Sequence, residues 1–351
     1  MRRGDIWRSR SLFPVNLSDI DYELPDDLIA QTPIEPRDSS RLLVDTGTSV
    51  PLHRRMTDVV EFLEPGDLLV VNDTRVLPAR LHLQRASGGA AEVLLLEPRD
   101  DEHRSWEAMI RPARKLKVGE TLEYFGKRVV RLGERTESGD TFAVEILDAD
   151  ALSIIERIGT MPLPPYIRGS LKDKERYQTV YARNARSAAA PTAGLHFTDD
   201  LLSRITSKGV DFARVELVVG LDTFKPVTAE NPLDHKIHTE SYSVPSETRE
   251  KIASARRVVA VGTTAARALE SAATLGVPSG RTSLFITRGY EWKTVDLLIT
   301  NFHMPRTSLL LMIDSFIGDR WRTLYEQAIA ERYRFLSFGD AMLLRRGSGK
   351  S

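Results

Sequence analysis

The stretch VVAVGTTAARALESAATLG, residues 258–276, indicates the fold class of this chain of 351 residues. Its first four residues are apolar and mostly β-branched, which is typical of a strand buried on both faces of a sheet. Gly262 permits a turn, Thr263 and Thr264 begin a helix rich in alanine and leucine, and Gly276 ends that helix. A strand that leads through a tight turn into a helix is the building unit of a layered α/β domain.

Further strand and helix patterns flank this unit. Thr198 is placed to cap a helix that Gly209 ends, and residues 210–219 alternate as a strand. Apolar runs predict more strands at residues 42–44, 68–71, 283–287 and 295–300, and periodic runs predict helices at 308–317 and 319–333. We therefore expect an α/β fold, a layered αβα domain with a largely parallel or mixed sheet.

Residues 78–157 have a different pattern. Short alternating runs separated by turn residues, without a helical period, predict a small β-barrel of about six strands. Because the α/β pattern resumes afterwards, the barrel is predicted to be an insertion. The expected organisation is a disordered extension at 1–17, a discontinuous α/β domain at 18–77 and 158–346, the barrel at 78–157, and a loose tail at 347–351.

Composition excludes several kinds of protein. Lys and Arg number 49, as do Asp and Glu, so no overall field indicates nucleic acid, although a local basic surface would suffice. The absence of cysteine removes disulfides, thiolate catalysis and iron–sulfur clusters. The arginine-rich N-terminus lacks the apolar core of a signal peptide, and no apolar window has the length of a membrane span. We expect a cytoplasmic protein.

The segment AAAPTAGLHF, residues 188–197, is the most informative stretch for function. Its small residues let a ligand approach the backbone and the imidazole of His196 closely, although a structural turn is the alternative. Polar residues follow two apolar strands in Asn72-Asp73-Thr74-Arg75 and in Asn301-Phe302-His303. In open α/β sheets, ligands bind at the carboxyl ends of strands.

Two other segments suggest a ligand. The turn Gly262-Thr263-Thr264 presents N–H groups and a helix N-terminus to an anion, with Arg267 one turn further on; an ordinary capped turn is the alternative. His235, His238 and Glu240 have the composition of a metal site. Their segment is expected to be extended, which points residues three apart to opposite faces, so we expect no metal.

Basic residues gather on the predicted barrel. Arg111, Arg114, Lys115 and Lys117 form one group, and Lys127, Arg128 and Arg131 follow close in sequence. Such a strip would contact the phosphates of a nucleic acid, although a solvated surface is the alternative.

Ordered motifs run from about Asp19 to Leu344. They are DYELPDDLIAQTP from Asp21, RDSSRLLV from Arg37, PGDLLVVNDTRVLPARL from Pro65, MPLPPYI from Met161, ERYQTVYA from Glu175, APTAGLHF from Ala190, HKIHTESY from His235, VAVGTTAARALES from Val259, VDLLITNFHMP from Val295 and YRFLSFGDAML from Tyr333. In these motifs the chain resembles the S-adenosylmethionine:tRNA ribosyltransferase-isomerase family of queuosine biosynthesis.

The resemblance implies an α/β domain with an inserted β-barrel, and a reaction. The ribosyl part of S-adenosylmethionine moves onto 7-aminomethyl-7-deazaguanine at the wobble position of a tRNA with a GUN anticodon. The sugar rearranges to an epoxycyclopentanediol, which gives epoxyqueuosine-tRNA, and adenine and methionine leave. S-adenosylmethionine is the ribosyl donor, no metal is implied, and we expect a monomer.

For that reaction we predict His196 as the base or acid, with His238 and His303 as second choices, because a base must take a hydrogen beside the sulfonium. Gly262, Thr263, Thr264 and Arg267 would hold the methionine end. The remaining residues expected to bind substrate are Asn72, Thr74, Arg75, Tyr177, Thr192, Gly194 and Asn301.

Three residues depart from the family pattern. Asp222 stands where glycine is usual, Arg288 where proline is usual, and Asp314 where serine is usual. A charged residue in a substrate pocket would change substrate preference. Three alternatives therefore stay open: a diverged relative that acts on another amine or a free deazaguanine, a noncatalytic RNA-binding relative, and a metal-dependent hydrolase.

Overall fold

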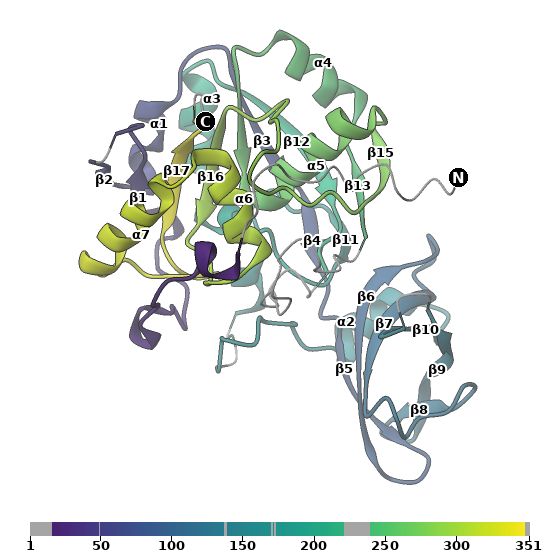
Figure 1. Cartoon of the computed structure of the whole chain (residues 1–351). Helices are drawn as coiled ribbons and strands as arrows, with labels where there is room; N and C mark the ends of the chain where they lie inside the picture. Colours follow the sequence, from purple (N-terminus) through teal and green to yellow (C-terminus); the bar gives the residue numbers. More distant parts are fainter. Residues whose placement is uncertain are drawn as a thin grey trace. The chain divides into compact units, whose positions relative to one another are not determined.

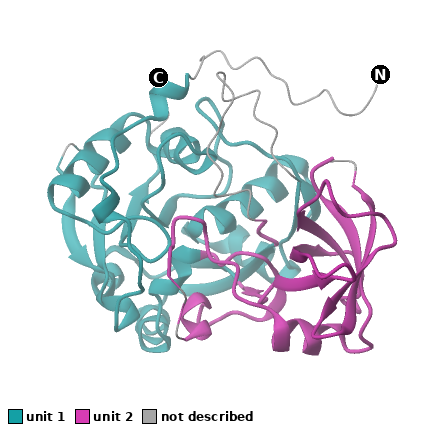
Figure 2. Ribbon diagram, turned by 90° about the horizontal axis from the view of Figure 1, so that it is seen from below, with its two compact units in different colours: residues 1–72, 192–217, 223–351 teal, residues 73–191, 218–222 magenta. Residues whose placement is uncertain are grey.

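A computed structural model describes residues 16–48, 50–136, 139–169, 171, 173–220 and 239–347. The chain divides into two compact units: unit 1 has residues 1–72, 192–217 and 223–351, and unit 2 has residues 73–191 and 218–222 (Figure 2). The domain boundaries expected at residues 78 and 157 stay a prediction. Most of the expected extension and tail lies outside the described residues, and Leu17 begins the first 3-10 helix. None of the described helices is long and apolar enough to span a membrane.

Unit 1 is built on a mixed sheet of nine strands in the order β15-β13-β12-β3-β14-β16-β17-β1-β2 (Figure 1). The strands are β1 (Arg41–Val44), β2 (Leu52–Arg55), β3 (Asp67–Asn72), β12 (Asp211–Leu217), β13 (Glu240–Ser243), β14 (Arg257–Val261), β15 (Ser279–Thr282), β16 (Leu297–Asn301) and β17 (Ala341–Arg345). The neighbours β12, β3, β14 and β16 are parallel, so their carboxyl ends meet at one edge, whereas β17 is antiparallel to β16. The predicted α/β class with a mixed sheet is confirmed.

The helices of unit 1 include α5, which packs on the sheet against β12, β14 and β16. They are α1 (Val59–Phe62), α3 (Asp199–Ser207), α4 (Ser246–Ser254), α5 (Gly262–Leu275), α6 (Ser308–Ile317) and α7 (Arg320–Ala330), with 3-10 turns η1 (Leu17–Ile20), η2 (Asp26–Leu28), η3 (Arg37–Ser39), η4 (Met56–Asp58) and η6 (Thr192–His196). The predicted start and end signals hold: Thr198 Oγ1 caps α3 by accepting a hydrogen bond from the N–H of Leu201, and Gly276 ends α5 at φ +69°.

One predicted strand is wrong. Residues 283–287 are not a strand; the ladder with β13 instead uses residues 279–282. The hydroxyl of Thr282 accepts a hydrogen bond from the N–H of Leu284 at 3.0 Å, so that donor is not available to a neighbouring strand. The alternation of Leu284 and Ile286 suggested a strand. Ile286 is indeed buried, but this segment pairs with no described strand.

Unit 2 contains a closed barrel in the order β10-β7-β6-β5-β8-β9, which confirms the expected six-stranded barrel. Its elements are β5 (Arg80–Arg85), β6 (Ala90–Pro98), β7 (Ser105–Arg111), β8 (Thr121–Tyr124), β9 (Lys127–Arg135), β10 (Phe142–Ile146) and α2 (Ala151–Ile158); the unit also has β4 (Thr74–Val76), β11 (Asn184–Ser187) and η5 (Lys174–Tyr177). Alternate residues of β7 and β10 are buried, and Trp106, Val130 and Ile146 belong to the barrel core.

Candidate active site

The His196 loop forms η6 at the edge of the sheet where the parallel strands end. Thr192 Oγ1 donates a hydrogen bond to Oδ1 of Asn301, the last residue of β16, at 2.9 Å. A Cβ built on Gly262, which follows β14, would lie 3.6 Å from Cβ of Ala193. The structure therefore brings together three predicted segments: the loop with the imidazole, the end of β16, and the start of α5.

His196 is buried, with 4% of its surface exposed, and both ring nitrogens have partners. Nδ1 lies 2.8 Å from Oγ of Ser40, and Nε2 lies 3.0 Å from Nδ2 of Asn301. The Asn301 amide is oriented by Thr192 at its oxygen and by the carbonyl of Asp340, which accepts from Nδ2 at 3.3 Å. Because Asn301 donates, Nε2 is the acceptor, and the ring proton resides on Nδ1.

Burial disfavours the charged form of the imidazole. It lowers the pKa of His196 to about 4, and the positive charge of Arg334 acts in the same direction. His196 is therefore neutral near pH 7 and presents a lone pair at Nε2. Such a ring is available as a proton acceptor, whereas the protonated form that a general acid needs is scarce.

Ser40 and Asp340 are part of this arrangement, and sequence analysis missed both. The N–H of Arg41, next to Ser40, donates to Oδ1 of Asp340 at 2.8 Å, and Oδ2 of Asp340 accepts from the N–H of Arg334 at 2.8 Å. Hydrogen bonds therefore connect Ser40, His196, Asn301 and Asp340 in series, and the peptide bond from Ser40 to Arg41 closes the circuit through the Arg41 N–H on Asp340. Their only signal in the sequence is that both lie in motifs of the chain, RDSSRLLV and YRFLSFGDAML.

His303 lies two residues beyond β16 and is also buried. Its Nε2 is 2.9 Å from Oγ1 of Thr300, and its backbone N–H donates to Oη of Tyr325 at 3.0 Å. Burial lowers the pKa of His303 to about 3. No hydrogen bond joins the His303 and His196 rings among the described residues.

We expect the free energy of unfolding to fall as the pH is lowered from 7 to 5. Unfolded imidazoles take up a proton near pH 6.5, whereas His196 and His303 resist protonation in the fold until about pH 4 and 3. Below about pH 6.5 the unfolded state therefore binds more protons, and the fold loses about 2 kcal/mol per histidine by pH 5. Urea unfolding at both pH values should show a smaller loss for His303→Gln than for wild type. His82→Gln, at an exposed imidazole, is the control; equal losses in all three proteins would contradict the expectation.

The start of α5 has an unusual backbone and an unpaired hydroxyl. Gly262 has φ +87°, a conformation that favours glycine. Thr263 and Thr264 are 8% and 9% exposed, and among the described residues Oγ1 of Thr264 has no hydrogen-bond partner. A buried polar atom without a partner is costly, so this hydroxyl is available to a ligand atom or to water.

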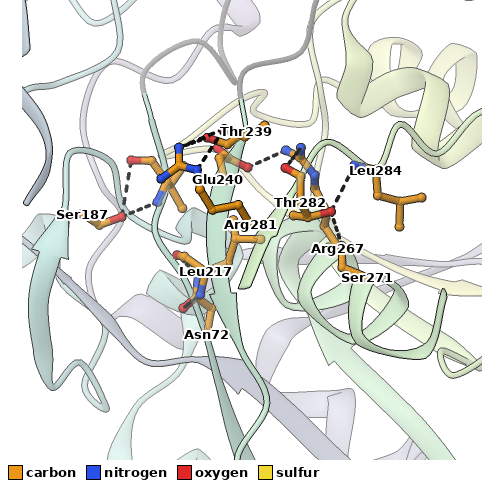
Figure 3. Close-up of polar contacts among 11 residues, drawn as sticks. Asn72, Ser187, Leu217, Thr239, Glu240, Arg267, Ser271, Arg281, Thr282 and Leu284 are labelled. Atoms are coloured by element: carbon orange, nitrogen blue, oxygen red, sulfur yellow. Dashed lines mark hydrogen bonds and ion pairs between the residues drawn. The ribbon is translucent and has the colours of Figure 1, made fainter. Parts of the chain in front are cut away.

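The Arg267 guanidinium binds groups on β13 and β15, not a group at the start of its own helix. Its guanidinium forms an ion pair with Glu240 of β13, and Nη2 donates to the carbonyl of Thr282 at 3.5 Å (Figure 3). Both side chains of the pair are largely buried. Glu240, which the metal hypothesis requires, is thus bound by a cation, and it is the first residue of β13.

The other predicted binding residues lie in different surroundings. Asn72 is buried at the end of β3, where its amide donates to the carbonyl of Leu217 at 3.0 Å and accepts from the Leu217 N–H at 3.2 Å (Figure 3). Gly194 is buried within η6. Thr74, Arg75 and Tyr177 belong to unit 2, where Arg75 pairs with Glu175 at 2.7 Å and burial raises the pKa of Tyr177. Their contacts with substrate stay predictions.

Asp222, His235 and His238 lie outside the described residues. Within the described ranges, no group of three or more His, Cys, Asp or Glu side chains is placed to hold a metal ion.

Two of the residues that depart from the family pattern, Arg288 and Asp314, bind each other. Arg288 Nε donates to Oδ2 of Asp314 at 3.0 Å, and Nη2 donates to Oδ1 at 2.6 Å. Two of the three departures are therefore one compensated ion pair.

Comparison with known proteins places this architecture in a family. The model of a family described as "Queuosine biosynthesis protein" matches residues 17–344. The chain belongs to this family. The resemblance inferred from the ordered motifs is thereby confirmed, and it covers the barrel as well as the α/β unit.

Members of the family that are similar to the chain are named as one enzyme. S-adenosylmethionine:tRNA ribosyltransferase-isomerase of Rubrobacter xylanophilus is 49% identical, over 95% of this chain and 98% of the relative. The enzyme of the same name from Gloeobacter violaceus is 48% identical, over 94% and 96%. A crystal structure of S-adenosylmethionine tRNA ribosyltransferase from Thermotoga maritima is 38% identical, covers 93% of this chain and 99% of that one, and aligns with a TM-score of 0.53.

Proposed function

We propose that this protein is an S-adenosylmethionine-dependent tRNA ribosyltransferase-isomerase. It transfers the ribosyl moiety of S-adenosylmethionine to 7-aminomethyl-7-deazaguanine at the wobble position of a tRNA with a GUN anticodon. The product is epoxyqueuosine-tRNA, and adenine and methionine are released. The enzyme acts as a cytoplasmic monomer. The observation that carries the proposal is the buried imidazole of His196 at the carboxyl end of β16, in a loop that contacts the start of α5, in a member of this family.

In this proposal His196 is the base. The positive sulfur of the donor makes the adjacent C5′ hydrogens acidic, so a neutral imidazole is a sufficient acceptor. The C5′–H bond breaks, the proton moves to Nε2, and the electron pair stays on C5′ beside the sulfonium. Asn301 must release Nε2 for this step, while Ser40 continues to accept from Nδ1 and keeps the ring in its tautomer.

The start of α5 is the proposed site for the methionine end of the donor. Its N-terminal N–H groups and the partial positive charge of the helix favour a carboxylate. Gly262, at φ +87°, lets the chain turn tightly into the helix, and the hydroxyl of Thr264, which has no partner among the described residues, is available to donate. Arg267 contributes indirectly, because its guanidinium is bound by Glu240.

Thr264→Val should weaken binding of S-adenosylmethionine by roughly tenfold or more, because a hydrogen bond to a charged group is lost. Valine has nearly the same shape, so thermal stability should stay equal or rise once the unpaired hydroxyl is removed. Isothermal titration with the donor measures the affinity. Ser271→Ala, which breaks the 2.7 Å hydrogen bond to Thr282 further along α5, is the control: it should cost stability and leave donor affinity unchanged. Unchanged affinity in Thr264→Val would remove the methionine site from this helix.

The complete reaction is tested by incubating the protein with S-adenosylmethionine and an anticodon stem-loop that carries the deazaguanine precursor. Mass analysis of the digested nucleosides should show the epoxycyclopentanediol adduct, with one adenine and one methionine released per adduct. An unmodified stem-loop is the control, and the free deazaguanine base is tested as a second substrate. Absence of both the adduct and adenine would refute the proposal, and adduct on the free base alone would favour the diverged relative.

A further inference from the structure

Most basic side chains on the barrel strands already have a carboxylate partner. Lys127 pairs with Asp148 at 2.6 Å, Arg131 with Glu145 at 2.7 Å, and Arg128 with Glu123 at 3.9 Å. Arg80, Arg85 and Arg104 likewise pair with Glu92, Glu120 and Glu145. Each cation of the second group of the predicted basic strip thus has a carboxylate partner within the barrel, and Arg131 shares Glu145 with Arg104.

The first group is not. Residues 111–117 read RPARKLK, with four cations and no acidic residue. Arg111, Arg114, Lys115 and Lys117 are all exposed, and among the described residues none of the four has a carboxylate within ion-pair distance. The nearest acid in sequence, Glu120, is bound by Arg85 at 2.6 Å. It also accepts a hydrogen bond from the backbone N–H of Lys117 at 3.0 Å, and after Arg85 the charge of Lys117 helps to lower its pKa, so Lys117 is the least available of the four cations. We call residues 111–117 the cationic loop; it joins β7 to β8.

The barrel holds the cationic loop in place. Ala113 and Leu116 pack against the barrel core, so the charged residues between and beside them face solvent. The N–H of Lys115 donates to the carbonyl of Pro112 at 3.1 Å, and the N–H of Gly119 donates to the carbonyl of Leu132 at 2.7 Å. Since the backbone is fixed at both sides, binding an anion here orders only side chains, which reduces its entropic cost.

We propose that the cationic loop binds backbone phosphates of the tRNA. A chain with equal numbers of acidic and basic residues can attract a polyanion only through a local excess of charge, and this loop has one. Phosphate contacts position a nucleic acid without selecting its sequence. The inference therefore concerns affinity and placement of the tRNA, and it rests on the proposed function.

The test compares two variants of equal charge change. The loop variant is Arg114→Gln/Lys115→Gln/Lys117→Gln, and the matched control is Lys127→Gln/Arg128→Gln/Arg131→Gln, which removes cations that already have partners. Fluorescence anisotropy measures tRNA binding between 50 and 200 mM KCl. Over this interval the affinity of a protein with many phosphate contacts falls about a thousandfold. Titration with S-adenosylmethionine and thermal unfolding check that the donor site and the fold are intact.

We expect the loop variant to bind tRNA roughly tenfold more weakly and to lose about 2 units of the slope of log affinity against log salt concentration, since each phosphate contact contributes about 0.7–0.9. The control should change the slope by much less, and both variants should bind the donor as the wild type does. Equal effects of the two variants, or an unchanged slope in the loop variant, would overturn the inference. If the wild type forms no adduct yet binds tRNA through this loop, the proposed reaction fails and this inference stands.

Discussion

His196→Gln is expected to lower turnover by roughly 10²- to 10⁴-fold, the usual contribution of a positioned general base. Glutamine can still form hydrogen bonds with Ser40 and Asn301, so the circuit that includes Asp340 is preserved while the proton acceptor is lost. Affinity for S-adenosylmethionine should change little. The measurement is the single-turnover rate of adenine release with a saturating modified stem-loop.

His303→Gln is the matched comparison, because it removes a second buried imidazole close to the end of β16. A loss of activity in His303→Gln that exceeds the loss in His196→Gln would transfer the role of base to His303. Turnover of His196→Gln within a few-fold of wild type would refute the role of His196 as base.

Arg288→Ala is expected to destabilise the protein by about 3 kcal/mol, since it leaves the carboxylate of Asp314 buried without its cation. The Asp314 side chain is fully buried, and its other side-chain donor among the described residues is Nε1 of Trp321 at 3.1 Å. Denaturant unfolding at pH 7 gives the change in free energy. The pair lies at α6 and the segment before β16, so we expect S-adenosylmethionine affinity of the folded variant to be unchanged.

The double variant Arg288→Pro/Asp314→Ser restores the residues usual in the family and provides the control. Because it removes both charges together, it should recover most of the stability lost in Arg288→Ala. If it is as unstable as the single variant, the two departures are not a compensated pair. A changed substrate preference in the double variant would instead support the hypothesis that these charges act on specificity.

Local patterns were sufficient for much of the fold. The strand, glycine and helix of residues 258–276, the Thr198 cap and the alternation in the barrel were all predicted, because short-range sterics and side-chain periodicity decide them. The strand expected at residues 283–287 failed since pairing is a property of two segments: β13 pairs with residues 279–282, and the hydroxyl of Thr282 takes the N–H of Leu284.

The candidate site, like the fold, could be predicted from the sequence only in part. Motif composition was enough to select His196, Asn301 and Gly262, and the parallel strands that end together explain why these residues lie at one edge. Arg267 was predicted from its position one turn into α5, but a guanidinium is long, and Glu240 from a strand distant in sequence binds it. Ser40 and Asp340 carry no chemical signature of their own, so they become visible only as partners of His196 and of the segment around it.

The order of motifs along the chain is enough to assign the family, the α/β class and the inserted barrel, because those depend on periodicity and on residues adjacent in sequence. Three features depend on the folded chain: the protonation state of His196, the pairing of Arg288 with Asp314, and which of the described barrel cations have a carboxylate within ion-pair distance. Each arises from burial or from a charge brought within a few ångströms by residues far apart in sequence, and electrostatic energies change steeply over such distances.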